Sequence, residues 1–81
     1  MTRKFNIEGI GNVNVSEEPE DFALKIQLSD MHITREIKFF SVDLLNGFFN
    51  DITEVHAKDM ALATIKNKIK LSVQEMDKKR H

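Results

Sequence analysis

The chain has 81 residues, with 12 Lys and Arg against 13 Asp and Glu, a single Pro and no Cys. This length allows one domain, and 41% hydrophobic with 31% charged residues is typical of a globular protein that folds in water. The lack of Cys excludes a disulfide framework, a thiolate metal site and a cysteine nucleophile. We expect a cytoplasmic protein, because the sequence has neither a signal-peptide core nor the roughly 18 consecutive apolar residues of a membrane span.

The charge is unevenly distributed along the chain. Residues 1–57 contain 5 basic and 10 acidic side chains, whereas residues 58–81 contain 7 basic and 3 acidic ones. Such a distribution suits nucleic-acid binding, an acidic partner, or antiparallel self-association in which each basic C-terminal region meets an acidic body.

The first expected element is a β-strand over residues 4–15. Apolar and polar residues alternate there, which is the period of a strand with one buried face. Gly9 and Gly11 interrupt the alternation on the apolar side, so they mark either a bulge in one long strand or the turn of a small hairpin. The acidic, Pro-containing residues 16–21 then form a solvent-exposed connection.

Two further strands are predicted over residues 22–28 and 31–40, where the same alternation recurs. If residues 29 and 30 form a two-residue turn, Ile26 lies directly opposite Ile33. This register collects the apolar side chains of both strands on one face of the sheet.

Arg35 falls on the apolar face of these strands, where a guanidinium is costly to bury. We expect its charged end to reach solvent along the edge of the sheet. The alternatives are an ion pair with Asp43 or Asp51, or a contact with a partner molecule.

The period becomes helical after Ser41, which is a suitable N-cap, and residues 42–78 are expected to be helical. Asn46-Gly47 is also typical of a β-hairpin, but a hairpin would place apolar residues on both faces, so we favour a helix there. One continuous helix and two consecutive helices are both allowed. We favour a break, because Asp51 and Glu54 have the spacing of a capping box.

The second half of the helical region carries an apolar stripe about 80° wide, which we expect to pack against the sheet or another helix. Its members are Leu62, Ile65, Ile69, Val73 and Met76. Met60 and Leu71 lie nearly opposite, and one packing surface cannot bury both sets. We therefore expect Met60 and Leu71 to form secondary contacts at a dimer interface, to which the stripe residues Ile69, Val73 and Met76 also contribute.

Residues with catalytic or metal-binding chemistry are few. His56 and Asp59 share a helix face, but no further ligand stands at a suitable spacing, so we expect no metal site. Gly9 and Gly11 lack the third glycine of a dinucleotide-binding loop, and the acidic residues 17–21 lack the pattern of a calcium-binding loop. We expect no enzymatic activity, no cofactor and no metal.

The basic C-terminal residues are the signal for nucleic-acid binding. They are Lys66, Lys70, Lys78, Lys79 and Arg80. Cations are what phosphate contacts require, but all six Phe lie at or before residue 49, so no aromatic side chain nearby could stack on bases. The negative end of a helix dipole is a sufficient reason for cations at a C-terminus.

The expected fold is α+β, a single domain over residues 1–81. It has a three-stranded antiparallel meander within residues 3–40, and one long or two consecutive helices within residues 42–78 cover one face. A helix over residues 42–78 would be about 55 Å long against about 26 Å for an eight-residue strand, so its last turns lack partners within one chain.

The expected function is that of a small non-enzymatic regulatory or adaptor protein, which acts by protein–protein interaction as a homodimer. In the dimer the C-terminal helices pair with each other or lie across the partner's sheet. The alternative function is a small nucleic-acid-binding regulator that uses the basic C-terminal helix. The expected partners are a second copy of the chain and another protein, with nucleic acid as the alternative and no membrane.

Overall fold

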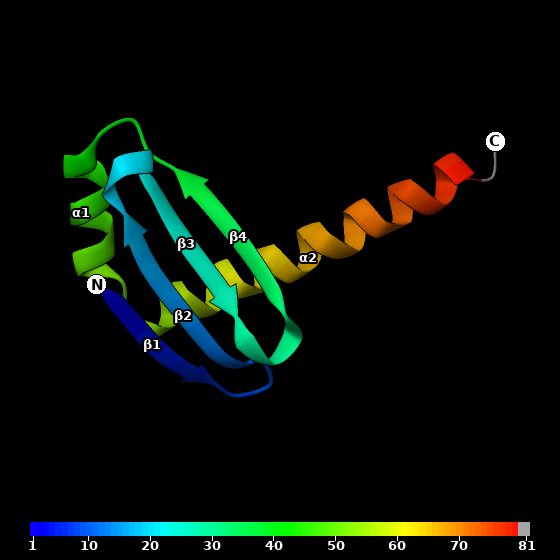
Figure 1. The fold of residues 1–81 in the computed structure, drawn as a ribbon. Helices are drawn as coiled ribbons and strands as arrows, with labels where there is room; N and C mark the ends of the chain where they lie inside the picture. The colour runs from blue at the N-terminus through cyan, green and yellow to red at the C-terminus, as the bar shows by residue number, and fades with distance from the viewer. Residues whose placement is uncertain (80–81) are drawn as a thin grey trace.

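A computed structural model describes residues 1–79, with side chains up to residue 70. The fold is α+β, with a four-stranded antiparallel sheet in the order β1-β2-β3-β4 and two helices (Figure 1). The elements are β1 (Thr2–Ile7), β2 (Gly11–Glu18), β3 (Ala23–Leu28), β4 (Ile33–Lys38), α1 (Val42–Asp51) and α2 (Glu54–Lys79). The expected class is confirmed, but the sheet has one strand more than the expected three.

The additional strand comes from a tight turn between β1 and β2. Gly9 and Gly11 have φ of +83° and +99°, a left-handed backbone that glycine adopts readily. The chain reverses there, with the amide of Ile10 donating to the carbonyl of Ile7, and Phe5 pairs with Val13 across the two strands. Of the two readings of these glycines, the hairpin turn is therefore correct and the bulge is wrong.

The predicted register of β3 and β4 is wrong by two residues. Ile26 lies opposite Arg35, and Leu28 lies opposite Ile33. The reason is the length of the turn: residues 29–32 form a short 3₁₀ turn that ends at His32 with a left-handed φ of 54°. Because a shift of two preserves the alternation, the apolar residues still share one face.

The core lies between one face of the sheet and the two helices. Its fully or nearly buried members are Ile7, Ile10, Val13, Val15, Leu24, Ile26, Leu28, Leu45, Phe49, Ile52, Ala57 and Ala61. Figure 1 shows both helices behind the sheet, with α2 running across the strands. The opposite face carries polar side chains, among them Asn14, Lys25 and Gln27.

The helices begin where polar caps satisfy their first amides. The hydroxyl of Ser41 accepts from the amide of Leu44 at 3.2 Å, which confirms the predicted cap of α1. The predicted helix across Gly47 and the predicted break after α1 are also confirmed. The cap of α2, however, is Thr53 rather than Asp51.

Thr53 and His56 cap α2 reciprocally. The amide of His56 donates to Thr53 Oγ1, and the amide of Thr53 donates to His56 Nδ1, each at 3.4 Å. This is the geometry of a capping box with an imidazole in place of the usual Glu or Gln. His56 therefore has a structural role at the start of α2.

Arg3 joins β1 to the junction of the two helices. Its Nη1 donates to the carbonyl of Phe49 at 3.2 Å and to that of Ile52 at 2.5 Å, and its guanidinium lies over the ring of Phe5 at 5.4 Å. The last carbonyls of a helix lack intrahelical partners. The guanidinium of Arg3 donates to two such carbonyls and so holds the C-terminal end of α1 against β1.

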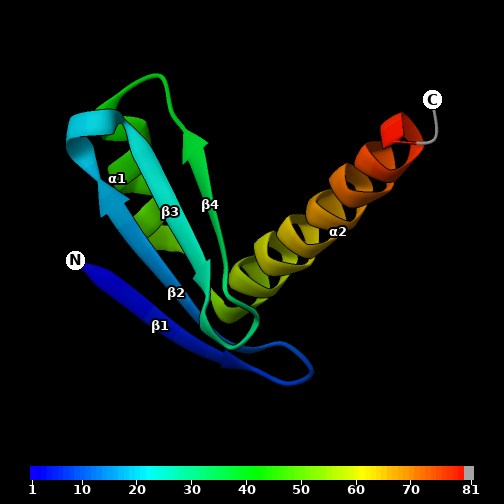
Figure 2. The ribbon, with the colours of Figure 1, turned by 45° about the vertical axis from the view of Figure 1, so that its right-hand side comes forward.

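Helix α2 is longer than the sheet that it crosses. Its 26 residues span about 39 Å, whereas four strands are only about 14 Å apart from first to last. Figures 1 and 2 show its C-terminal half extending past β4. The radius of gyration is accordingly 14.2 Å, against about 12 Å for a compact chain of this length. No helix among the described residues is both long enough and apolar enough to cross a membrane.

Candidate functional site

Small residues form the side of α2 that faces the sheet. Ala57, Ala61 and Thr64 are buried, and Met60 and Ile65 pack against the core at their margins. These short side chains let the helix lie close to the sheet, and the larger apolar side chains of the strands fill the space between them. The buried hydroxyl of Thr64 donates to the carbonyl of Met60 at 2.8 Å, so this polar group is satisfied.

The structure exchanges the two faces that the sequence predicted for α2. Leu62 and Ile69, members of the stripe expected to pack against the sheet or another helix, are 47% and 60% exposed, and of the described members of that stripe only Ile65 packs against the core. The contact of Ile69 with a partner stays a prediction. Met60, expected at a secondary contact, packs against the core instead. Leu71, Val73 and Met76 lie outside the residues whose side chains are described.

The exposed apolar side chains of α2 recur every seven residues. Val55, Leu62 and Ile69 are 67%, 47% and 60% exposed, and we call this set the outer stripe. At about 100° per residue the outer stripe lies roughly 130° around the helix from the buried residues. The sheet of the same chain therefore does not cover it. A seven-residue apolar repeat is the spacing with which helices pair along a seam.

Charges of opposite sign lie beside the outer stripe. Asp59 and Lys66 are both exposed and follow the same flank of the stripe, one on each side of Leu62 along the helix. The first turn of α2 is acidic at Glu54, whereas the exposed residues beyond the sheet include Lys68 and Lys70. The described part of α2 is thus polarised along its length.

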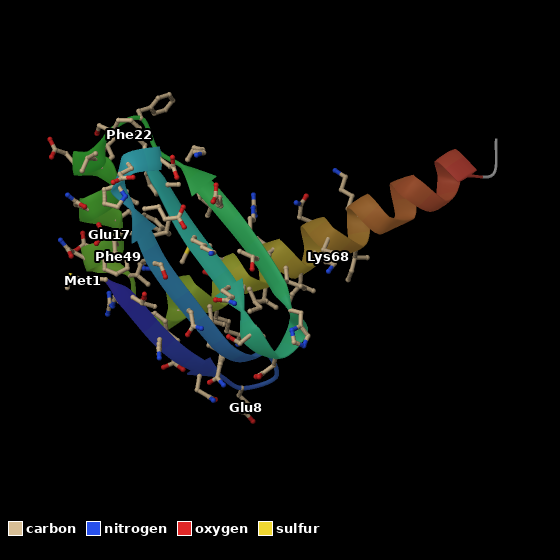
Figure 3. All side chains as sticks on the ribbon, viewed as in Figure 1. Met1, Glu8, Glu17, Phe22, Phe49 and Lys68 are labelled. Atoms are coloured by element: carbon tan, nitrogen blue, oxygen red, sulfur yellow. The ribbon has the colours of Figure 1, made fainter. Side chains whose placement is uncertain are left out.

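Two adjacent clefts lie between β4 and α2 where the helix leaves the sheet. The first, of about 290 Å³, is lined by Arg35, Ala63, Lys66, Asn67 and Lys70. The second, of about 360 Å³, is lined by His32, Ile33, Thr34, Arg35, Thr64, Asn67 and Lys68. None of these lining residues is acidic. Figure 3 shows Lys68 on the part of α2 that has passed β4.

Arg35 is half-buried and lines both clefts. The ion pair with Asp43 or Asp51, one of the predicted alternatives, is not formed: within residues 1–70 the structure contains the single pair Lys38–Glu36, at 3.8 Å. The register explains its position, because Arg35 faces the helix layer near the exit of α2. Its charge therefore adds to that of the helix lysines.

The predicted nucleic-acid residues are thus brought together in part. Lys66 and Lys70 line one cleft with Arg35, a residue that was not predicted for this role. Lys78 and Lys79 belong to α2 but their side chains are outside the described set, and Arg80 lies beyond the described residues. A sequence signal for Arg35 existed in its charge on an apolar strand face, but its helical neighbours depend on the crossing point of α2.

The described residues contain no group of three or more His, Cys, Asp or Glu side chains that could hold a metal ion. The chemistry of the site is therefore that of the outer stripe and the two basic clefts. Comparisons of the chain with protein-family models, with curated proteins and with solved structures found no match.

Proposed function

We propose that this chain is a small non-enzymatic adaptor protein that acts by binding other proteins and works as a homodimer, paired through α2. The observation that carries the proposal is the outer stripe, Val55, Leu62 and Ile69, which is exposed on a helix that runs past its own sheet. Burying apolar surface of this kind is worth roughly 25 cal/mol per Å². A second helix with the same repeat is the complementary surface.

The charge pattern favours antiparallel pairing about Leu62. In that arrangement Val55 of one helix faces Ile69 of the other, and Asp59 faces Lys66, so that each charge meets its opposite. Parallel pairing would bring the two acidic first turns together at Glu54, which is repulsive. The sheets lie to the side of the stripe, so they leave the second helix room to approach.

Sedimentation velocity over a wide concentration range tests the dimer. We expect Leu62→Lys to shift the protein to monomer, because it places two ammonium groups at the centre of the seam. Gln27→Lys is the matched control, since Gln27 is exposed on the polar face of the sheet. A wild-type protein that is monomeric at high micromolar concentration would contradict the proposal.

Disulfide trapping tests the antiparallel arrangement, and the chain contains no native Cys. Leu62→Cys should form a covalent dimer with itself on oxidation, because the two copies meet at the axis. Val55→Cys mixed with Ile69→Cys should form a heterodimer in preference to either homodimer. Homodimers of Val55→Cys at the yield of Leu62→Cys would indicate parallel pairing instead.

A second candidate function, binding to nucleic acid, is favoured by the convergence of Arg35, Lys66 and Lys70 on one cleft. If phosphates are the ligand, the logarithm of the affinity for duplex DNA should fall steeply with the logarithm of salt concentration. Lys66→Gln and Lys70→Gln should each reduce that slope. An affinity that neither variant changes would remove the cleft from this function.

A further inference from the structure

We propose that the free edge of β4 and the adjoining part of α2 form a groove for an extended acidic segment of a partner protein, which joins the sheet as a fifth strand. The proposal rests on the proposed adaptor function and names the class of partner. It differs from the homodimer contact in its occupant and in its residues, except for Lys66, which borders both the seam and one cleft.

The edge of β4 offers unpaired backbone groups. β4 is the last strand of the sheet, and within residues 1–79 its one pairing partner is β3. The amide of Phe39 donates to the carbonyl of Phe22 at 2.7 Å, and hydrogen-bonded pairs alternate along an antiparallel ladder. The N–H and C=O groups of Thr34 and Glu36 therefore point away from the sheet, where an added strand would bond to them.

Helix α2 supplies a floor for the added strand. A fifth strand would lie about 4.8 Å beyond β4, and α2 rises about 1.5 Å per residue. Residues 66–70 therefore cover the width of one strand just outside the existing sheet, as the course of α2 in Figures 1 and 2 shows. The first four strands already rest on α2 or α1 in this way.

The charge of the groove selects acidic side chains. The lining residues include Arg35, Lys66, Lys68 and Lys70, and none is acidic. Alternate side chains of a strand point to the same face and are about 6.6 Å apart. Two acidic residues at positions i and i+2 would thus place one carboxylate in each of the two adjacent clefts.

The groove fits a peptide better than it fits nucleic acid. Neither cleft is lined by a Phe, and the single imidazole of His32 in one cleft does not form the series of aromatic rings on which successive bases stack. Volumes of about 290 and 360 Å³ suit individual side chains. The outward N–H and C=O groups of β4 can hydrogen-bond to the C=O and N–H groups of an extended polypeptide, as in a β-sheet.

Fluorescence anisotropy with the full chain tests the groove. The probe is a labelled eight-residue peptide in which Glu alternates with Thr, and the control peptide has Gln in place of Glu. We expect the Glu peptide to bind at least tenfold more tightly than the Gln peptide. Arg35→Gln should weaken Glu-peptide binding at least fivefold, whereas Lys25→Gln, on the polar face of the sheet, should not change it.

Backbone methylation of the peptide provides a test that needs no protein variant. A strand added to β4 pairs along one edge only, so N-methylation of either the Glu or the Thr residues should abolish binding while the other pattern leaves it intact. Equal effects of the two patterns, or equal binding of the Glu and Gln peptides, would overturn the proposal. So would a labelled DNA duplex that binds more tightly than the Glu peptide at 150 mM salt.

Sedimentation of the same samples separates this proposal from the homodimer. Loss of the dimer in Leu62→Lys with unchanged peptide binding supports a groove formed within one chain. A stable dimer with no affinity for the Glu peptide overturns the groove and leaves the dimer standing. Peptide binding by a wild-type protein that sediments only as a monomer supports the groove and contradicts the dimer.

Discussion

Gly11 shows how a single residue determines the topology of this sheet. Its φ of +99° is one that other residues rarely adopt, and a Cβ at this position would overlap the carboxylate of Asp30. That carboxylate accepts the amide of Asn12 at 3.0 Å and so ties the β1–β2 turn to the β3–β4 turn. At Gly9, where φ is +83°, an added Cβ would have no atom within 4 Å.

The two glycines form a matched pair for mutation. We expect Gly9→Ala to cost about 1 kcal/mol, from backbone strain alone, and Gly11→Ala to cost roughly 2 to 3 kcal/mol, because steric overlap adds to the strain. Urea unfolding of both variants measures the difference. In an Asp30→Ala background most of the additional cost at Gly11 should disappear, because only the Cβ of residue 30, at 3.2 Å, remains close. Equal costs at Gly9 and Gly11 in the wild type would show that Asp30 does not restrict this position.

Arg3 is a second residue with a large effect on the structure, in this case through its side chain. Its hydrogen bonds to the carbonyls of Phe49 and Ile52 cross 46 and 49 residues of sequence. Replacement by Met keeps the aliphatic stem and removes the guanidinium donor from both carbonyls, although the carbonyl of Phe49 retains the amide of Ile52 at 3.4 Å. We expect Arg3→Met to lower the free energy of unfolding by about 1.5 to 3 kcal/mol.

The control for Arg3 is Lys4→Met, which should change stability by less than about 0.5 kcal/mol because Lys4 is exposed on the other face of β1. Arg3→Lys should recover only part of the loss, since the Lys nitrogen ends one bond short of Nη1, the atom that donates to both carbonyls, and Lys lacks the planar guanidinium that lies over Phe5. Thermal or urea unfolding gives the three values. A neutral Arg3→Met would show that water replaces the guanidinium at no cost.

The elements show which parts of the fold could be predicted from the sequence. Alternation identified the strands and their faces, and the change of period at Ser41 located the helices, because these signals are local. The register of β3 and β4 could not be predicted, since it depends on a turn of four residues without a strong turn motif. The cap of α2 was missed because His56 occupies a capping-box position where Glu or Gln is expected.

Helix α2 shows why the candidate site was only partly predictable. The larger apolar residues of α2 indicated which face would pack in the core. In the structure the face with small residues, Ala57, Ala61 and Thr64, packs on the sheet instead, because short side chains let the helix lie closer to the strands. Periodicity identifies an apolar stripe without identifying what covers it. The convergence of Arg35 with the helix lysines likewise depends on where α2 leaves the sheet, which is a tertiary property.

The N-terminal cap of α2 can be tested by mutation. Thr53→Ala removes the hydroxyl that accepts from the amide of His56, and we expect a loss of about 1 kcal/mol. Asp51→Ala, at the position that the sequence indicated as the cap, should be nearly neutral because Asp51 is the exposed last residue of α1. Chemical denaturation distinguishes the two, and the reverse order would restore Asp51 as the cap.

The whole molecule has a long helix on a small sheet, and its shape exposes surface that a second molecule can use. A chain of this length buries only roughly 60 to 65% of its unfolded surface, so burial in a dimer would add to a small margin of stability. The outer stripe itself and the other cleft-lining residues occupy different sides of the exposed part of α2, and Lys66 borders both. One helix can therefore offer surfaces for self-association and for partner binding that share the single side chain of Lys66.

The pairing of Asp59 with Lys66 across the dimer allows the orientation to be tested by charge. We expect Asp59→Lys and Lys66→Asp each to weaken the dimer by about fivefold at low salt, because each replaces two attractions by two repulsions at exposed positions. The double variant should recover wild-type affinity, since the charges are merely exchanged between helices. Sedimentation equilibrium measures the three dissociation constants, and Lys25→Asp on the polar face of the sheet is the control.

The salt dependence of the dimer dissociation constants also tests the pairing of Asp59 with Lys66. At about 1 M salt the Debye length falls to about 3 Å, so the single variants and the wild type should converge in affinity while the apolar seam persists. Parallel pairing predicts a different result, because Asp59 and Lys66 would then not face each other. In that arrangement the double variant would not recover the affinity lost in the single variants, and the antiparallel seam about Leu62 would have to be abandoned.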